Sequence, residues 1–229
     1  MNNVILIQAR LSSSRFPKKM LENINGITLI EYVYNRCRKS VKADKVIVIT
    51  SREKSDDELY KLCIDKNIAV FRGDLNNVLK RYIDASNYFN ADVICRVCGD
   101  SPFVDIDAID KMFSGFKISN NLEYMSTTNT LNGFTSEVFT LDLLKTVYTK
   151  KLSKEHKEHV TKYIRDNISE YKFKELNLDL RPKELENFTL TVDYPDDILT
   201  AQKISNNFID FDFTSDDVIN ILKQMEDNK

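Results

Sequence analysis

NVILIQARLSSSRFPKKML, residues 3–21, begins as a continuous apolar run that ends at Ala9. Such a run is typical of a strand that is covered on both faces of a parallel sheet. Four cations follow within ten residues, namely Arg10, Arg15, Lys18 and Lys19. Open parallel sheets bind ligands beyond the carboxyl ends of their strands. This loop therefore stands where such a fold would hold an anionic ligand.

Strand-like and helix-like segments alternate along the first hundred residues. The expected strands are 3–9, 44–50, 68–71 and 91–97, and the expected helices are 28–40, 56–66 and 78–89. The alternation predicts βαβ units with right-handed crossovers. We therefore expect a three-layer α/β/α fold with a mostly parallel, Rossmann-like central sheet.

The pattern loosens after Gly99 but continues to the end of the chain. Helices are expected at 106–113, 141–150 and 156–166, with two more near the C-terminus, and strands at 122–128, 136–141 and 187–195. Only 5 glycines and 4 prolines are present, so no flexible linker is evident. We expect residues 1–229 to form a single domain.

Composition argues against several classes of protein. The 229 residues carry 33 Lys and Arg against 35 Asp and Glu, so the chain lacks the basic surface of a nucleic-acid binder. No apolar run approaches the length of a membrane span, and the first residues do not resemble a signal peptide. We expect a cytoplasmic protein that binds neither nucleic acid nor membranes.

Cys95 and Cys98 form a CxxC pair inside an expected strand, VICRVCGD. Side chains three residues apart on a strand point to opposite faces, so these two would not grip one metal ion. We expect all four cysteines of the chain to be reduced thiols that pack as small apolar side chains.

The cationic loop suits a polyphosphate. Arginine binds phosphate oxygens in pairs, lysine adds a compact charge, and the serines at 12–14 add hydroxyl and N–H donors. The loop is neither a P-loop nor a GxGxxG turn, because it contains no glycine. A solvated turn with unconnected cations is the alternative.

Two aspartates complement the loop. Asp100 and Asp193 each follow an expected strand, and two carboxylates can hold Mg²⁺, which fills its shell with water and phosphate oxygens. Ordinary turn aspartates are the alternative. A DxD pair at Asp105 and Asp107 could instead hold a metal, but we expect Asp107 to cap the helix that follows.

Five ordered blocks resemble the cytidylyltransferase family that activates sugar acids, above all its spore-coat polysaccharide SpsF-type branch. The blocks are IQARLSSSRFPKKML (7–21), VFRGDLNNVLKRY (70–82), ICRVCGDSPFVD (94–105), KEHVTKYIR (157–165) and TVDYPDD (191–197). The first is close to the pattern QAR-x-x-S-x-R-x-P-x-K. The similarity spans roughly residues 3–200, which makes it far more specific than one motif.

The resemblance implies roles for individual residues. Those expected around the nucleotide are Ala9, Arg10, Ser13, Arg15, Lys19, Arg72 and Asp100, with Arg72 at the base and Arg10, Lys19 and Asp100 as catalytic residues. Asp100 and Asp193 match the two Mg²⁺-binding aspartates. Glu137, His159 and Asp193 are expected on the acceptor side. The family also implies a homodimer, with about residues 120–150 as the acceptor-side and dimerisation segment.

The chain departs from the family pattern at three positions. The family often has glycine where Ser12 and Lys18 stand, so we expect the loop to avoid backbone angles that only glycine tolerates. Thr135 stands where an aspartate is usual, which affects the identity of the acceptor. His156 and His159 could share one face of an expected helix, where a zinc site is not expected. A structural role in that helix is the alternative to the acceptor-side role of His159.

The leading hypothesis is a Mg²⁺-dependent cytidylyltransferase that joins CMP from CTP to a small acidic acceptor, most simply a sugar acid, with release of pyrophosphate. A phosphorylated acceptor is an alternative. A glycosyltransferase of the GT-A type, which shares a similar nucleotide-binding half, is a second alternative and would use Asp105 and Asp107. A nucleotide-binding regulatory module without catalysis is a third.

Overall fold

The computed structural model describes residues 1–119 and 121–227. Within these residues, seven strands form one sheet in the order β5-β4-β1-β6-β8-β7-β9. The strands are β1 (Asn3–Gln8), β4 (Lys45–Ser51), β5 (Val70–Gly73), β6 (Val93–Cys98), β7 (Tyr124–Thr130), β8 (Glu137–Thr140) and β9 (Phe173–Leu180). Strand β8 is antiparallel to both of its neighbours, and the other paired strands are parallel. The expected mostly parallel sheet is confirmed.

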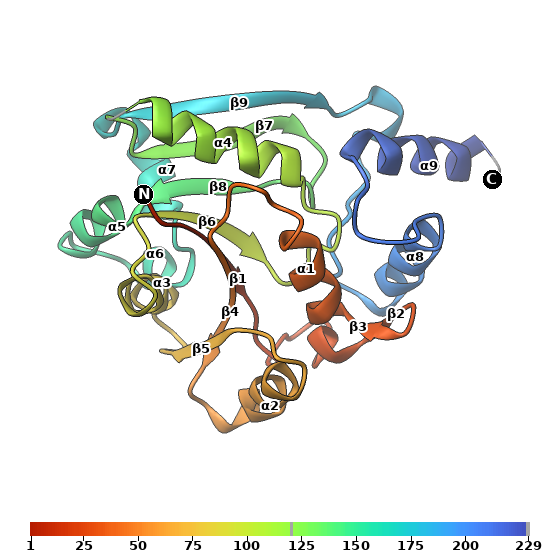
Figure 1. The fold of residues 1–229 in the computed structure, drawn as a ribbon, viewed down its shortest axis with the longest axis horizontal. Coiled ribbons are helices and arrows are strands. Elements are labelled where there is room, and N and C mark those ends of the chain that lie inside the picture. The colour runs from red at the N-terminus through yellow and green to blue at the C-terminus, as the bar shows by residue number, and fades with distance from the viewer. Residues whose placement is uncertain (120, 228–229) are drawn as a thin grey trace.

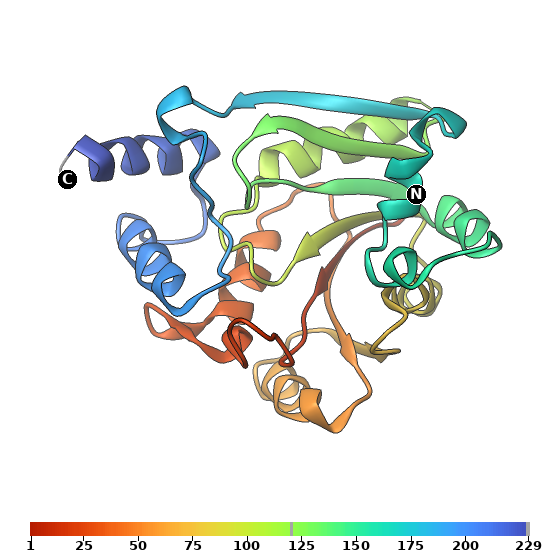
Figure 2. The same cartoon turned by 180° about the vertical axis from the view of Figure 1, so that it is seen from behind.

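Helices cover both faces of this sheet (Figures 1 and 2). They are α1 (Leu29–Cys37), α2 (Asp57–Asp65), α3 (Val78–Tyr88), α4 (Ile106–Ile118), α5 (Leu141–Tyr148), α6 (Lys154–Glu158), α7 (Lys162–Asp166), α8 (Pro195–Ser205) and α9 (Ser215–Asp227). Smaller elements are the hairpin of β2 (Asn23–Ile24) and β3 (Ile27–Thr28) and the 3-10 turns η1 (Lys19–Leu21), η2 (Lys54–Asp56), η3 (Ile168–Glu170) and η4 (Lys183–Leu185). None of the helices described is long and apolar enough to cross a membrane.

Strand β1 divides the core into two layers. Ile5 and Ile7 belong to one apolar cluster, which includes side chains of α1, α4, α8 and α9. Val4 and Leu6 belong to the other cluster, with side chains of α3 and α5. Because successive side chains of a strand point to opposite faces, a continuous apolar run is needed to fill both layers. The three-layer prediction from this run is confirmed.

Polar caps fix where two of the helices begin. Thr28 accepts from the N–H of Glu31, whose carboxylate in turn accepts from the N–H of Thr28, a capping box that starts α1. Asp105 caps α4 by accepting from the N–H of Ala108 at 2.9 Å. The expectation that Asp107 is the cap was wrong, because the extended backbone of the N-cap lies at Asp105 and Asp107 is already in the first turn.

Two differences from the expected strands lie in the C-terminal half. Residues 187–195 do not form a strand: the segment runs from a turn at Asn187 to the start of α8 at Pro195 and makes one isolated bridge, between Asn132 and Thr189. The place beside β7 is taken by β9, which the sequence analysis missed. Its sequence, FKELNLDL, is largely polar and half-exposed, since β9 is the edge strand of the sheet.

The single helix expected at 156–166 is two short helices. The backbone leaves helical geometry at His159 (φ −103°, ψ 86°), which closes α6. Val160 and Thr161 are buried in the turn before α7 begins. In this turn the buried Thr161 hydroxyl donates to Glu137 at 2.9 Å.

The expected dimerisation segment contains β7 and β8, and its first residue, Asn120, lies outside the described residues. Both strands are paired on both sides, β8 by β6 and β7, and β7 by β8 and β9. Their backbone edges therefore complete the sheet of this chain. Among the described residues, β9 is the edge strand on this side of the sheet, and its outer edge is unpaired (Figure 1).

A homodimer nevertheless stays a prediction for this chain. An unpaired edge strand such as β9 presents N–H and C=O groups that a second copy can satisfy. We expect sedimentation equilibrium at micromolar concentration to give twice the 26.6 kDa mass of the chain. The mass of one chain under these conditions would contradict the prediction.

Candidate active site

Two cavities adjoin each other, the first beyond the carboxyl ends of β1 and β6 and the second over the part of the sheet formed by β6, β7, β8 and β9. The first, of about 370 Å³, is lined by Gln8, Ala9, Arg10, Ser13, Ser14, Arg15, Lys19, Met20, Val78, Arg81, Arg96, Cys98, Asp100, Glu158, His159 and Asp193. The second, of about 560 Å³, is lined by Arg96, Cys98, Asp100, Ser101, Tyr124, Ser126, Thr127, Asn132, Thr135, Ser136, Glu137, Arg165, Ile168, Phe173, Glu175 and Thr191. They share Arg96, Cys98 and Asp100, so β6 and the turn after it stand between them.

The first cavity gathers most of the residues expected around a nucleotide. The sequence-predicted residues that line it are Ala9, Arg10, Ser13, Arg15, Lys19, Asp100, His159 and Asp193. The loop after β1 is held in place by the N–H of Leu11, which donates to buried Asp56 at 2.7 Å, and by the N–H of Lys18, which donates to the carbonyl of Leu11. Cations are therefore presented to the cavity by an anchored loop.

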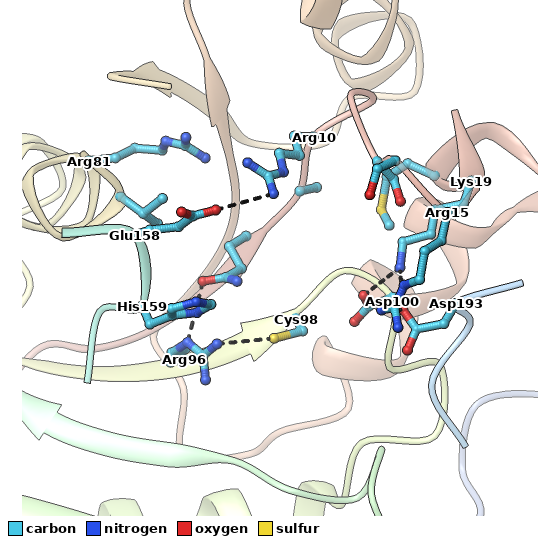
Figure 3. Close-up of a pocket in the computed structure, with 16 residues that line it drawn as sticks. Arg10, Arg15, Lys19, Arg81, Arg96, Cys98, Asp100, Glu158, His159 and Asp193 are labelled. Atoms are coloured by element: carbon cyan, nitrogen blue, oxygen red, sulfur yellow. Dashed lines mark hydrogen bonds and ion pairs between the residues drawn. The ribbon is translucent and has the colours of Figure 1, made fainter. Parts of the chain in front are cut away.

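Lys19 joins the two aspartates expected to bind metal (Figure 3). Its ammonium donates to Asp100 Oδ2 at 2.7 Å and to Asp193 Oδ1 at 3.2 Å. A third bond, at 2.6 Å, goes to the carbonyl of Val192, and the residue is only 6% exposed. Both carboxylates thus converge on one nitrogen, as expected from the sequence, although no strand ends at Asp193.

Convergence is achieved by a backbone bond rather than by sheet pairing. The N–H of Val192 donates to the carbonyl of Asp100 at 2.8 Å, which lays the segment before α8 beside the turn after β6. Arg15 also reaches this point and donates to Asp193 Oδ1 at 2.6 Å. The charge of Asp193, with a further contribution from Tyr194, raises the pKa of Arg15.

The carboxylate pair fits a Mg²⁺ ion that takes few ligands from protein. Asp100 and Asp193 point to the same spot and are each about a quarter exposed to the cavity. Within the described residues, no group of three or more His, Cys, Asp or Glu side chains could enclose a metal. Water and phosphate oxygens would have to complete the shell, which is the usual arrangement for Mg²⁺. The ammonium of Lys19 neutralises the same carboxylates.

Arg10 and Lys18 have different surroundings. Arg10 lines the first cavity, where its guanidinium lies 3.6 Å from the carboxylate of Glu158. Lys18 pairs outside the cavity with Glu58 at 2.6 Å. Lys18 also adopts left-handed backbone angles (φ 58°, ψ 16°), which favour glycine but are not restricted to it, so the expectation that the loop avoids angles only glycine tolerates is not contradicted. The tight return of the loop to Leu11 requires that conformation, which glycine would adopt more readily.

Arg72 is not brought to either cavity. Its guanidinium donates to the carbonyls of Ser51 and Glu53 and pairs with Asp57 at 2.7 Å. These contacts tie β5 to the loop after β4. The contact between Arg72 and a nucleotide base therefore stays a prediction.

The two histidines lie in different surroundings. His159 lines the first cavity, so it lies on the side of the cationic loop and not in the second cavity, where an acceptor-side residue was expected. His156 completes a cap with Ser153 and lies 3.1 Å from Asp166, which links α6 to α7. His156 is therefore structural.

Glu137 lines the second cavity, but its carboxylate is already saturated by four donors. Arg96 at 2.7 Å and Thr161 at 2.9 Å donate to Oε2, while Arg165 at 3.0 Å and the hydroxyl of Tyr124 donate to Oε1. Burial raises the pKa of Glu137, but the two guanidiniums and the two hydroxyls outweigh it and lower the pKa. Glu137 is thus a charged centre that positions Arg96 and Arg165.

Sequence reasoning missed several cavity residues, namely Gln8, Arg81, Arg96, Glu158 and Arg165. Arg96 offered a signal, because it is a charged residue in the middle of the apolar run VICRVC. Arg81 and Arg165 stand in helical stretches, where cations are common on solvated faces and give no such signal.

The DxD and CxxC alternatives find no support in the geometry. Asp105 caps α4, Asp107 is exposed in its first turn, and neither lines the two cavities. Cys95 is buried in the core, whereas Cys98 faces both cavities, as expected for residues three apart on a strand. All four cysteines are free thiols.

Comparison with known proteins agrees with this geometry. The profile of a family described as cytidylyltransferase matches residues 4–224. An uncharacterized protein of Methanocaldococcus jannaschii is 34% identical, covering 97% of this chain and 90% of that protein. The spore coat polysaccharide biosynthesis protein SpsF of Bacillus subtilis is 31% identical, covering 86% and 84%. The structure of a cytidylyltransferase from Leptospira borgpetersenii superposes with a TM-score of 0.92 at 28% identity, covering 99% and 96%. The chain therefore belongs to the cytidylyltransferase family, as its sequence motifs predict.

Proposed function

We propose that this enzyme joins CMP from CTP to a small hydroxylated acid, a sugar acid for surface polysaccharide or glycan synthesis, and releases pyrophosphate. The observation that carries the proposal is the pair of cavities that meet at Asp100. A transferase with two substrates needs one site for each and a shared boundary where the bond is made. The similarity to SpsF, a polysaccharide biosynthesis protein by name, supports the class of product.

In this proposal the first cavity holds the nucleotide. Arg10, Arg15 and Lys19 would surround the triphosphate and neutralise the charge that builds up on the leaving pyrophosphate. The acceptor oxygen attacks the α-phosphorus from the second cavity, at the boundary marked by Asp100. Positioning and charge neutralisation supply the catalysis, and no covalent intermediate with the protein is required.

Mg²⁺ is the proposed cofactor, and Asp100 and Asp193 would hold it. When bound, it would polarise the α-phosphate and help to align the two reactants. Lys19 contacts both carboxylates, so this ammonium would share the neutralisation of the phosphates and keep the two side chains together.

The second cavity suits a hydroxylated anion. Its wall contains hydroxyl and amide groups that can bond sugar hydroxyls, from Ser101, Ser126, Thr127, Asn132, Thr135 and Thr191. Within the described residues, the one direct ion-pair partner of Arg96 and Arg165 is the buried Glu137, so the three side chains together carry one positive charge. A carboxylate or phosphate on the acceptor would balance that charge.

The test is a panel of acceptors with CTP and Mg²⁺, in which pyrophosphate release is measured and products are identified by mass spectrometry. We expect a CMP conjugate with a sugar acid. A CDP-type product from a phosphate ester would revise the acceptor. Tight binding of CTP without turnover on a broad panel would favour a regulatory role, and no pyrophosphate from any nucleoside triphosphate would refute the proposal.

Arg10 and Lys18 provide a matched pair of substitutions in the loop. Arg10→Ala should lower kcat/KM by roughly 30- to 150-fold, because a charged hydrogen bond in a desolvated site contributes ~2–3 kcal/mol. Lys18→Ala should change it little, since Lys18 pairs with Glu58 outside the cavity. Steady-state kinetics on both variants checks this, and equal losses would mean that the loop presents different residues to the phosphates.

A further inference from the structure

One wall of the second cavity is a single row of residues across the sheet. Arg96 of β6 is paired with Glu137 of β8, which is paired with Ser126 of β7, which is paired with Glu175 of β9. All four residues line the cavity, and their strands lie side by side (Figure 1). Neighbouring strands are about 4.8 Å apart, so the row extends for about 14 Å from β6 to β9. Its β6 end also lines the first cavity, whereas its β9 end does not.

The end of the row at β6 and β8 has an excess of positive charge. Arg96 and Arg165 both pair with Glu137, at 2.7 and 3.0 Å, so these three side chains leave one positive charge. The side chain of Arg165 is 49% exposed, and its Nε and Nη2 make no hydrogen bond among the described residues. These donors can therefore bind the carboxylate of the acceptor in the proposed function, on which this inference rests.

The end of the row at β9 has the opposite charge. Glu175 is exposed, and its carboxylate has neither an ion pair nor a hydrogen bond among the described residues. By contrast, Glu137 has four donors, and Asp100 pairs with Lys19 at 2.7 Å. Among the described residues that line the second cavity, Glu175 is therefore the carboxylate left for a ligand.

Phe173 gives the same end an aromatic surface. It stands two residues before Glu175, so both side chains point to the same face of β9, and both line the second cavity. Phe173 is 44% exposed, so part of its ring is open to a ligand. A carboxylate beside an aromatic ring is a favourable site for an ammonium group, which gains an ion pair and a cation–π contact there.

We propose that the acceptor is an amino sugar acid, with its carboxylate at Arg165 and its ammonium group between Glu175 and Phe173. The wall has one net positive charge at one end and one negative charge at the other, so it matches a dipolar ligand without net charge. An acid with only hydroxyls at its far end would bring a second negative charge into the cavity and leave Glu175 unneutralised.

The amine takes no part in the bond that is made. The acceptor hydroxyl at Asp100 attacks the α-phosphorus and loses its proton to water, and pyrophosphate leaves. The ammonium group at the other end keeps its protons, because β9 lies three strands away from β6. The product is therefore a CMP conjugate that is linked through oxygen and has a free amine.

The experiment compares kcat/KM, with CTP and Mg²⁺, for pairs of keto sugar acids of the octulosonic and nonulosonic type. The members of each pair differ only at the terminal carbon, which bears a hydroxyl in one and an amine in the other. The wild type should prefer the amine of at least one pair by about tenfold, since an exposed ion pair and a cation–π contact each contribute a few-fold. Glu175→Gln should bring this ratio close to one, because the amide keeps the shape but cannot neutralise an ammonium.

Three further variants show whether charge at this position sets the preference. Glu175→Asp should retain most of the preference, because it keeps the carboxylate. Phe173→Leu should lower the ratio by only a few-fold, since leucine is apolar but has no π face. Glu170→Gln is the matched control and should keep the wild-type ratio, because Glu170 is an exposed carboxylate of η3 that lines neither cavity.

The outcomes separate this inference from the proposed function. If no acceptor of the panel yields a CMP conjugate, the proposed function fails and this inference fails with it. If the wild type uses both members of every pair equally well, or prefers the hydroxyl, only the amine is refuted. A preference for the amine that survives in Glu175→Gln would refute the role of Glu175. A phosphorus–nitrogen bond in the product, detected by phosphorus NMR, would place the amine at Asp100 and overturn the proposed orientation.

Discussion

Asparagine in place of Asp100 or Asp193 is expected to reduce turnover about 100-fold or more, because the Mg²⁺ that the two carboxylates are proposed to hold would stabilise the negative charge that develops on the phosphates. Each substitution keeps the shape of the side chain and removes one negative charge from the site around Lys19. Both carboxylates already contact the Lys19 ammonium, at 2.7 and 3.2 Å, so they act at one point. The double variant should therefore lose little more than the worse single variant.

Initial rates of pyrophosphate release, with melting temperatures recorded beside them, test this expectation. Asp107→Asn is the matched control, because Asp107 is an exposed aspartate that lines neither cavity. This variant should retain full activity. That result would also exclude the GT-A alternative, in which Asp107 binds the metal. Losses that simply multiply in the double variant would show that Asp100 and Asp193 act independently.

The dependence of rate on Mg²⁺ concentration separates two roles for the aspartates. If they hold the metal, each asparagine variant should need more Mg²⁺ for half-maximal rate. If they serve mainly to position Lys19, the rate should fall with no change in the Mg²⁺ requirement. The structure motivates the comparison, because the Lys19 ammonium lies between the two carboxylates.

The pattern of apolar residues along the sequence predicted the strands of the parallel part of the sheet and the loop that follows the first of them. Continuous apolar runs such as 3–9 indicated strands covered on both faces, and the positions of Ile5, Ile7, Val4 and Leu6 in two separate clusters confirm it. The position of the loop cations was predicted from the same run, because they directly follow the strand that it forms, β1. The topological rule for open sheets then located the cavity.

The route by which distant segments come together was beyond such reasoning, even where their meeting was expected. Asp193 reaches Asp100 through a single backbone bond from Val192, and no periodicity records that bond. Strand β9 has a polar, half-exposed sequence that only its pairing with β7 makes a strand. In the sequence, Arg81 looks like an ordinary cation of a helix, because nothing there indicates that its side chain packs against Gly73.

Glu137 carries the second large expected effect, and this one concerns stability. Glu137→Leu should lower the free energy of unfolding by about 3–5 kcal/mol, the usual cost of leaving a buried charge without its partner. Arg96, which donates to Glu137 at 2.7 Å, is the charge that would be stranded. Tyr124 and Thr161 would lose their acceptor as well. Urea unfolding at neutral pH measures the change.

A second substitution and a pH series show whether the loss comes from the charge pair. Adding Arg96→Met to Glu137→Leu should recover part of the stability, since an apolar replacement of the whole pair is often tolerated. The pKa of Glu137 lies below its ordinary value of 4.5 because Arg96 and Arg165 outweigh burial. Its contribution is therefore complete above that value and is lost as the pH falls through the lowered pKa, so wild type and Glu137→Leu should converge in acid. Purely additive losses, or a difference that does not shrink in acid, would mean that Glu137 stabilises the fold by packing rather than by its charge.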